Sequence, residues 1–121
     1  TIKLGKSFSK NIRDNWSYNI EDDLAFPVAI GKAGSYFSIP IDQLLIIFLQ
    51  SFVSNLITVG IKHIPLGQSA GQRILIKLIP VIQEQSLKYK KCDIKDIGSC
   101  AFISDLTSMY HETLKNRIYQ T

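Results

Sequence analysis

Apolar residues recur at helical spacing in the first part of the chain. Leu4, Phe8 and Ile12 lie four residues apart within the polar stretch 3–15, which predicts a short amphipathic helix. A second helix is expected within 24–37, where Pro27 suits the first turn and small residues allow a neighbouring backbone to come close. The acids just before it should face the positive end of its dipole; they are Glu21, Asp22 and Asp23.

A long apolar segment, 41–61, follows, with no charge between Asp42 and Lys62. As a helix it is long enough to span a membrane. It lacks the basic flank and aromatic belt of such a span, and its polar side chains gather in one sector. These are Gln43, Gln50, Ser51, Ser54, Asn55 and Thr58. We therefore expect a core helix that is the most buried element of the fold and is ended by Pro65.

A further helix is predicted to begin within 66–72, where Ser69 and Gln72 suggest a capping box. Pro80 should kink or end this helix unless tertiary contacts prevail. The polar segment 84–99 is predicted to be a linking loop. Helical spacing returns in a last helix before a loose tail, at Ile103, Leu106, Met109 or Tyr110, and Leu114.

No segment alternates strictly between apolar and polar residues, and no hairpin turn is present, so an all-α helical bundle is predicted. The 121 residues suit one helical domain, 1–121. Hydrophobic residues form 45% and charged residues 20% of the chain, as in ordinary globular proteins. The net charge of +4 comes from bases that are scattered apart from the short run Lys88, Lys90 and Lys91, which argues against nucleic-acid binding.

The candidate metal ligands follow no zinc pattern. Cys92 and Cys100 are not paired as in C-x-x-C, and His63 and His111 lie at unrelated intervals from them. Whether a metal touches either histidine stays open. The first residues lack the apolar core of a signal peptide, so a cytoplasmic location is expected.

The stretch GQSAGQR, 67–73, contains glycines like those of a phosphate-binding loop, but its glycines are four apart and the lysine is missing. Gly67 and Gly71 are predicted to share one helical face, with Gln68 and Gln72 on the adjacent face. Uncharged amides suit a desolvated protein contact better than catalysis. A helix start with solvent-facing glutamines is the alternative.

No catalytic arrangement is recognisable. His111 and Glu112 are adjacent and so point about 100° apart on a helix, and no H-E-x-x-H motif accompanies them. No Gly-x-Ser-x-Gly elbow supports a nucleophile. The chain is therefore predicted not to be an enzyme.

Three segments together resemble the C-terminal half of the UreF family of urease accessory proteins, in order and at familiar separations. They are FPVAIGKAG (26–34), PLGQSAGQRIL (65–75) and SMYHETLKNRIY (108–119). The resemblance covers essentially the whole chain, but family members are considerably longer and carry an earlier Phe-Pro-x-Gly-Gly element that is missing here. A fragment and a truncated homologue both stay open.

This resemblance implies an all-helical, non-catalytic scaffold that dimerises and binds the accessory protein UreD (also called UreH). With UreD it would recruit the GTPase UreG and support nickel insertion into apo-urease. The nickel would be handled by the complex, and no cofactor is expected in this chain. The partner-binding residues are then expected to be Gly67, Gln68, Gly71, Gln72, Arg73, Met109, His111, Glu112, Arg117 and Tyr119.

Residues 115–121 are similar to a flexible tail that becomes ordered when UreD binds, so that its ordering cost is met only in the complex. Tyr110, Tyr119 and Gln120 depart from the family's usual residues in this signature. A second hypothesis is that the face bearing Gln68 and Gln72 regulates the GTPase. The competing functions are a small helical membrane-associated protein and a basic nucleic-acid-binding module.

Overall fold

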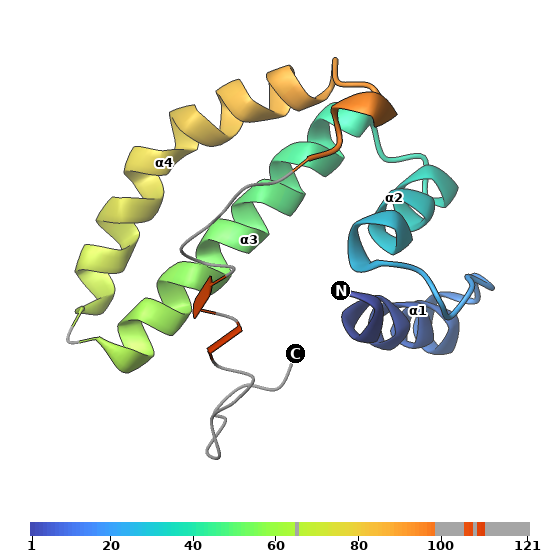
Figure 1. The fold of residues 1–121 in the computed structure, drawn as a ribbon, viewed down its shortest axis with the longest axis horizontal. Helices are drawn as coiled ribbons and strands as arrows, with labels where there is room; N and C mark the ends of the chain where they lie inside the picture. The colour runs from blue at the N-terminus through green and yellow to red at the C-terminus, as the bar shows by residue number, and fades with distance from the viewer. Residues whose placement is uncertain (65, 99–105, 108, 111–121) are drawn as a thin grey trace.

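The computed structural model describes residues 1–64, 66–98, 106, 107, 109 and 110, and its longer elements are all helices (Figure 1). No strand occurs among these residues, so the predicted all-α class is confirmed. The helices are α1 (Ile2–Trp16), α2 (Phe26–Tyr36), α3 (Ile41–His63), α4 (Gln68–Tyr89) and the short 3-10 helix η1 (Ile94–Asp96).

The first two helices pack together, and the small core of the molecule lies between them. Ile12 of α1, Ile20 of the connecting loop and Ala29 of α2 are buried side by side. Phe8 stands edge-on to Phe26, with their ring centroids 5.7 Å apart. The predicted amphipathic first helix is thus confirmed, because its apolar stripe faces this core.

Gly5 lets the backbone of the loop touch α1. A Cβ atom placed on Gly5 would lie 1.9 Å from the carbonyl oxygen of Leu24. The amide of Phe26 also donates a hydrogen bond to the carbonyl oxygen of Thr1, at 3.3 Å. Only glycine permits this approach, since a backbone atom cannot move aside as a side chain can.

Charged side chains fasten the loop between α1 and α2. Arg13 donates to the carbonyl oxygen of Ile20 and to Asp22, both at 2.6 Å. Lys32 donates to both carboxylate oxygens of Glu21, at 2.7 and 2.5 Å. The hydrogen bond from Lys32 lowers the pKa of Glu21, assisted by a backbone hydrogen bond and by the charge of Lys32.

The prediction that the acids face the start of α2 is therefore wrong for Glu21 and Asp22. No acid lies in the first turn of α2, which begins at Phe26 after Ala25. A full positive charge at hydrogen-bond distance attracts a carboxylate more strongly than the partial charge of a helix end. Glu21 and Asp22 consequently pair with bases, whereas Pro27 takes the predicted place in the first turn.

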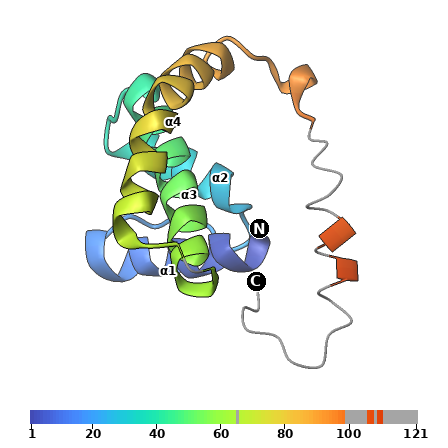
Figure 2. The same cartoon turned by 90° about the vertical axis from the view of Figure 1, so that its left-hand side faces the viewer.

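Helices α3 and α4 run antiparallel as a hairpin (Figures 1 and 2). α3 starts after Pro40 and ends at His63, before the proline at position 65, as predicted. At the open end of the hairpin, Lys90 donates to the carboxylate of Asp42, at 2.9 Å to Oδ2. This pair joins the end of α4 to the beginning of α3.

The predicted start of α4 within 66–72 is confirmed, whereas the predicted capping box and the start of the predicted loop at residue 84 are wrong. The helix starts at Gln68, after an N-cap Gly67 without a side-chain cap, so Ser69 lies inside it and no capping box forms. It passes through Pro80, bending along its length in Figure 1, and continues to Tyr89, so the first part of the predicted loop 84–99 is helical. Contacts with α3 account for this, because Ile82 and Ser86 are buried in this stretch.

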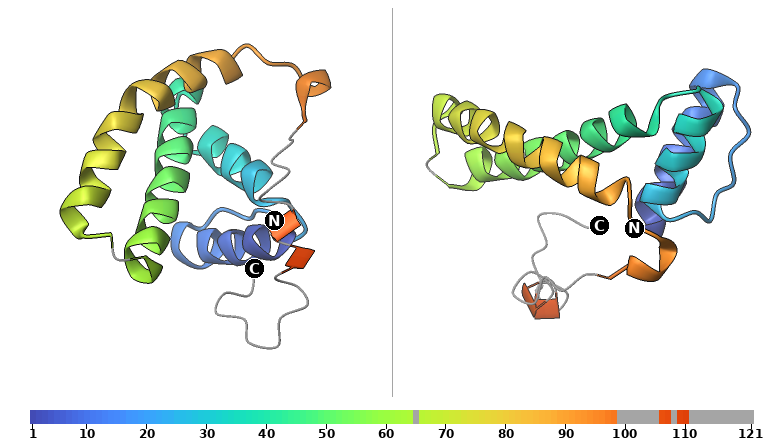
Figure 3. Two further views of the ribbon diagram at one scale, coloured as in Figure 1. Left: turned by 60° about the vertical axis from the view of Figure 1, so that its left-hand side comes forward. Right: turned by 90° about the horizontal axis from the view of Figure 1, so that it is seen from above.

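The largest correction concerns α3, which was expected to be the most buried element and has no buried residue. Its large side chains stay accessible, Phe52 by 57% and Leu56 by 58%. α4 covers one side of it and α2 touches only its beginning, so the hairpin extends away from the α1–α2 pair (Figure 3). Among the described helices, α3 has the length and apolar character to cross a membrane, on composition alone.

We predict that Gly5→Ala destabilises the fold by about 1–3 kcal/mol, because the new methyl group would overlap the backbone of Leu24. The matched control is Gly31→Ala in α2, where nothing lies within 4 Å of the added Cβ. This control should stabilise the protein by about 1 kcal/mol through helix propensity. Urea unfolding followed by circular dichroism measures both; equal effects would contradict the proposed close approach.

Candidate partner-binding surface

The predicted amide surface lies at the start of α4. Gln68 and Gln72 are one helical turn apart and both are exposed, as is Arg73. Arg73 donates a hydrogen bond to the hydroxyl of Ser69, at 2.9 Å, which holds the guanidinium along the helix. Two amides and one cation thus form a polar, hydrogen-bonding patch at the closed end of the hairpin.

The two glycines of this stretch do different things. Gly71 is buried, and a Cβ there would lie 2.6 Å from Cδ1 of Ile61 and 3.0 Å from Cγ2 of Ile57. It therefore allows α4 to pack closely on α3. Gly67 is exposed at the helix N-cap, with nothing within 4 Å of an added Cβ. The predicted shared glycine face is wrong, because one glycine faces the partner helix and the other faces solvent.

The remaining predicted residues belong to the last part of the chain. Met109 is described and is 66% exposed. In Figure 2 the described pieces 106–107 and 109–110 stand apart from α3 and α4. His111, Glu112, Arg117, Tyr119 and the predicted tail 115–121 lie outside the described residues.

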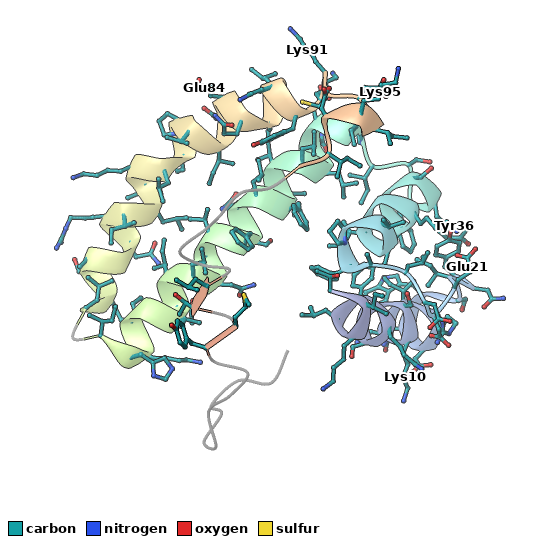
Figure 4. All side chains as sticks on the ribbon, in the orientation of Figure 1. Lys10, Glu21, Tyr36, Glu84, Lys91 and Lys95 are labelled. Atoms are coloured by element: carbon teal, nitrogen blue, oxygen red, sulfur yellow. The ribbon has the colours of Figure 1, made fainter. Side chains whose placement is uncertain are left out.

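A basic row on α1 was not anticipated from the sequence. Lys3, Lys6, Lys10 and Arg13 line one shallow depression of about 350 Å³ together with Ser7 and Asp22. Their spacing of three and four residues places them on one face, so the prediction of scattered bases is wrong for this helix. Elsewhere, charged side chains such as Glu84, Lys91 and Lys95 point outward singly (Figure 4).

An apolar groove of about 380 Å³ lies between α2 and α3. Sequence reasoning missed it because α3 was expected to be covered on all sides. Its lining combines large apolar residues with three polar ones: Thr1, Phe26, Pro27, Ile30, Leu44, Ile47, Phe48, Ser51, Phe52 and Asn55.

Metal-ligating side chains do not gather at these three surfaces in the described structure. No cluster of three or more His, Cys, Asp or Glu side chains occurs within the described part of the chain. Cys92 is exposed, and its thiol makes a long 3.6 Å contact with the carbonyl oxygen of Lys88. What the described residues offer is a polar patch, a basic row and an apolar groove, which are surfaces suited to contacts with other macromolecules.

Comparison with known proteins agrees with a protein that acts through contacts with other macromolecules. The UreF family model matches residues 1–79, and the chain belongs to the UreF family. It is 30% identical to the urease accessory protein UreF of Roseobacter denitrificans over its whole length, covering 54% of that relative. It is 34% identical to the urease accessory protein UreF of Bradyrhizobium sp. strain ORS 278, again over its whole length, and covers 53% of that relative. For Cereibacter sphaeroides strain ATCC 17025 the identity is 40% over 78% of this chain.

The chain thus spans about half the length of the curated relatives it matches. The predicted family is confirmed. The relatives are named as accessory proteins of urease, in agreement with the prediction that this chain is not an enzyme. No solved structure was found to match it.

We predict that Gly71→Leu costs about 1–3 kcal/mol of stability, because the side chain would push α4 away from Ile57 and Ile61. The double variant Gln68→Ala, Gln72→Ala should change stability by no more than about 0.5 kcal/mol, since both amides are exposed. Urea unfolding distinguishes the two. A large loss in the glutamine variant would show that the amides hold the fold together.

Proposed function

We propose that this chain acts as a non-catalytic adaptor in urease maturation. In this role it binds UreD (UreH), recruits the GTPase UreG with it, and supports nickel insertion into apo-urease in the cytoplasm, as a homodimer. The observation that carries the proposal is membership of the UreF family over residues 1–79, together with relatives named as urease accessory proteins.

The polar patch at the start of α4 supports a role in protein contacts. Gln68 and Gln72 can each donate and accept hydrogen bonds without the desolvation cost of a charge. Arg73 adds a planar donor that binds a carboxylate through two parallel hydrogen bonds. A patch of this kind gives a partner specificity through hydrogen-bond geometry, and it is exposed in the described structure.

Nickel is the cargo of the proposed assembly. Imidazole and thiolate are suitable ligands for nickel, and a stable site needs several of them close together. No such cluster of three occurs among the described residues. We propose that the other components of the complex supply the nickel ligands, as the resemblance to the UreF family implies, and that this chain holds those components together.

Membrane association through α3 is the competing function that a specific observation favours. α3 is uncovered on one side, and its most apolar stretch has a mean hydropathy of 2.1. Its exposed face nevertheless includes Ser51 and Asn55, whose hydrogen-bonding groups lipid tails cannot satisfy. A protein neighbour satisfies them, which is why the adaptor is preferred.

We predict that tagged protein co-purifies UreD and, in the presence of UreD, UreG. Arg117→Ala should weaken this recruitment by removing a charge-assisted contact, while helicity measured by circular dichroism stays unchanged. Gln83→Ala in α4 is a control, because Gln83 is exposed and far along the helix from the polar patch. Failure of the unmodified chain to bind UreD, or normal binding by Arg117→Ala, would count against the proposal.

Regulation of the GTPase is a second proposal for the same patch. If the amides contact UreG, GTP turnover by UreG with UreD present should change when this chain is added. The double variant Gln68→Ala, Gln72→Ala should reduce that change, and Gln83→Ala should not. Identical turnover with and without the unmodified chain would exclude a regulatory role and leave recruitment as the function.

A further inference from the structure

We propose that the apolar groove between α2 and α3 binds an amphipathic helix from the half of the UreF family's length that this sequence does not contain. The bound helix would cover the accessible face of α3. This inference goes beyond adaptor function, because it concerns which segment covers the accessible face of α3. It does not concern which accessory protein the chain recruits.

The groove has two apolar walls. Phe26, Pro27 and Ile30 of α2 form one wall. The other is a face of α3 that includes Leu44 and Phe48, and the rings of Phe26 and Phe48 have centroids 6.3 Å apart. The space between the walls is about 380 Å³. The two helices approach closely where the side chain of Leu44 packs against Gly34.

The accessible face of α3 points away from α4. Leu49 and Val53 line the depression shared with α4, and Ile57 packs on Gly71. Ile47 and Phe52 lie on the groove side and keep 55% and 57% of their surface accessible. Removing large apolar side chains from water is the main favourable contribution to association, so this face is suited to binding.

The length of the relatives identifies the occupant. The chain aligns over its whole length with about half of the Roseobacter protein, so the family fold contains as much chain again. Thr1 also lines the groove. The described elements are all helical, and a helix laid into an apolar groove is a common way for such a face to be covered.

The polar residues of the groove set the chemistry of that helix. Ser51 and Asn55 are one turn apart on α3 and line the groove among apolar neighbours. Once covered, their hydroxyl and amide groups need hydrogen-bond partners. The occupant should therefore have an apolar stripe interrupted by at least one polar side chain, which a lipid tail does not provide.

The test co-expresses this chain with the complementary half of the Roseobacter relative, which is the part outside the match. Stoichiometric co-purification is expected. Ile47→Asp combined with Phe52→Asp should weaken binding at least about tenfold, because charges would be buried in the contact. The control is Ile76→Asp combined with Ile94→Asp, which alters side chains that are 63% and 81% exposed on or after α4. This control should bind normally.

Hydrogen–deuterium exchange gives a second readout that does not depend on the variants. Peptides from the groove side of α2 and α3 should be protected when the complementary half is present, and peptides around Ile76 should not change. Protection confined to α4, or equal loss of binding in both aspartate pairs, would overturn the proposal.

Two other occupants are distinguishable in the same preparation. If the unmodified chain elutes as a dimer that the groove variant alone dissociates, a second copy occupies the groove. If it floats with vesicles of phosphatidylcholine and phosphatidylglycerol and the groove variant does not, lipid is the occupant. Either result overturns the proposal. UreD recruitment is scored separately, so loss of groove binding and loss of adaptor function are told apart.

Discussion

The accessible side of α3 is the constraint on which the rest of this structure depends. The segment between Asp42 and Lys62 carries no charge, and burying its apolar side chains would be favourable. Among the described elements, α4 is the one that lies against most of its length. The α1–α2 pair buries its own small core around Ile12, Ile20 and Ala29 and touches α3 only near its start. The described part of the fold is thus two helical pairs joined by a limited contact, and it leaves many large apolar side chains accessible.

Close approach and ion pairing hold each helical pair together. Gly5 brings the loop onto α1, and Gly71 brings α4 onto α3. Arg13 and Lys32 fix the loop through Asp22 and Glu21. Exposed pairs of this kind contribute little energy individually, so their main effect is to select the loop's path. The apolar contacts and the glycines decide how near the helices come.

The surfaces left over are consistent with a protein that works through its neighbours. A polar patch at the start of α4, a basic row on α1 and an apolar groove beside α3 lie on different parts of the molecule. Each has a different chemistry, so each suits a different kind of contact. Family membership connects these surfaces with urease maturation, and the length of the relatives connects the groove with the rest of the family fold.

The sequence by itself determined the helical class, the family and most helix bounds, because these depend on local signals. Prolines at positions 27, 40 and 65 mark helix ends through backbone geometry that acts within one or two residues. The apolar stripe of α1 follows equally from spacing alone.

Tertiary structure decided everything that depends on a distant neighbour. α4 continues through Pro80 because α3 lies against it, and Gly71 points inward because Ile61 is there. The acids before α2 pair with bases for the same reason, since Arg13 and Lys32 come within reach only after the helices fold together. The prediction that α3 is the most buried helix was wrong for the same reason, since burial depends on which other elements pack against it. Hydrophobic periodicity indicates that a helix face needs to be covered, but it does not show which other element covers it.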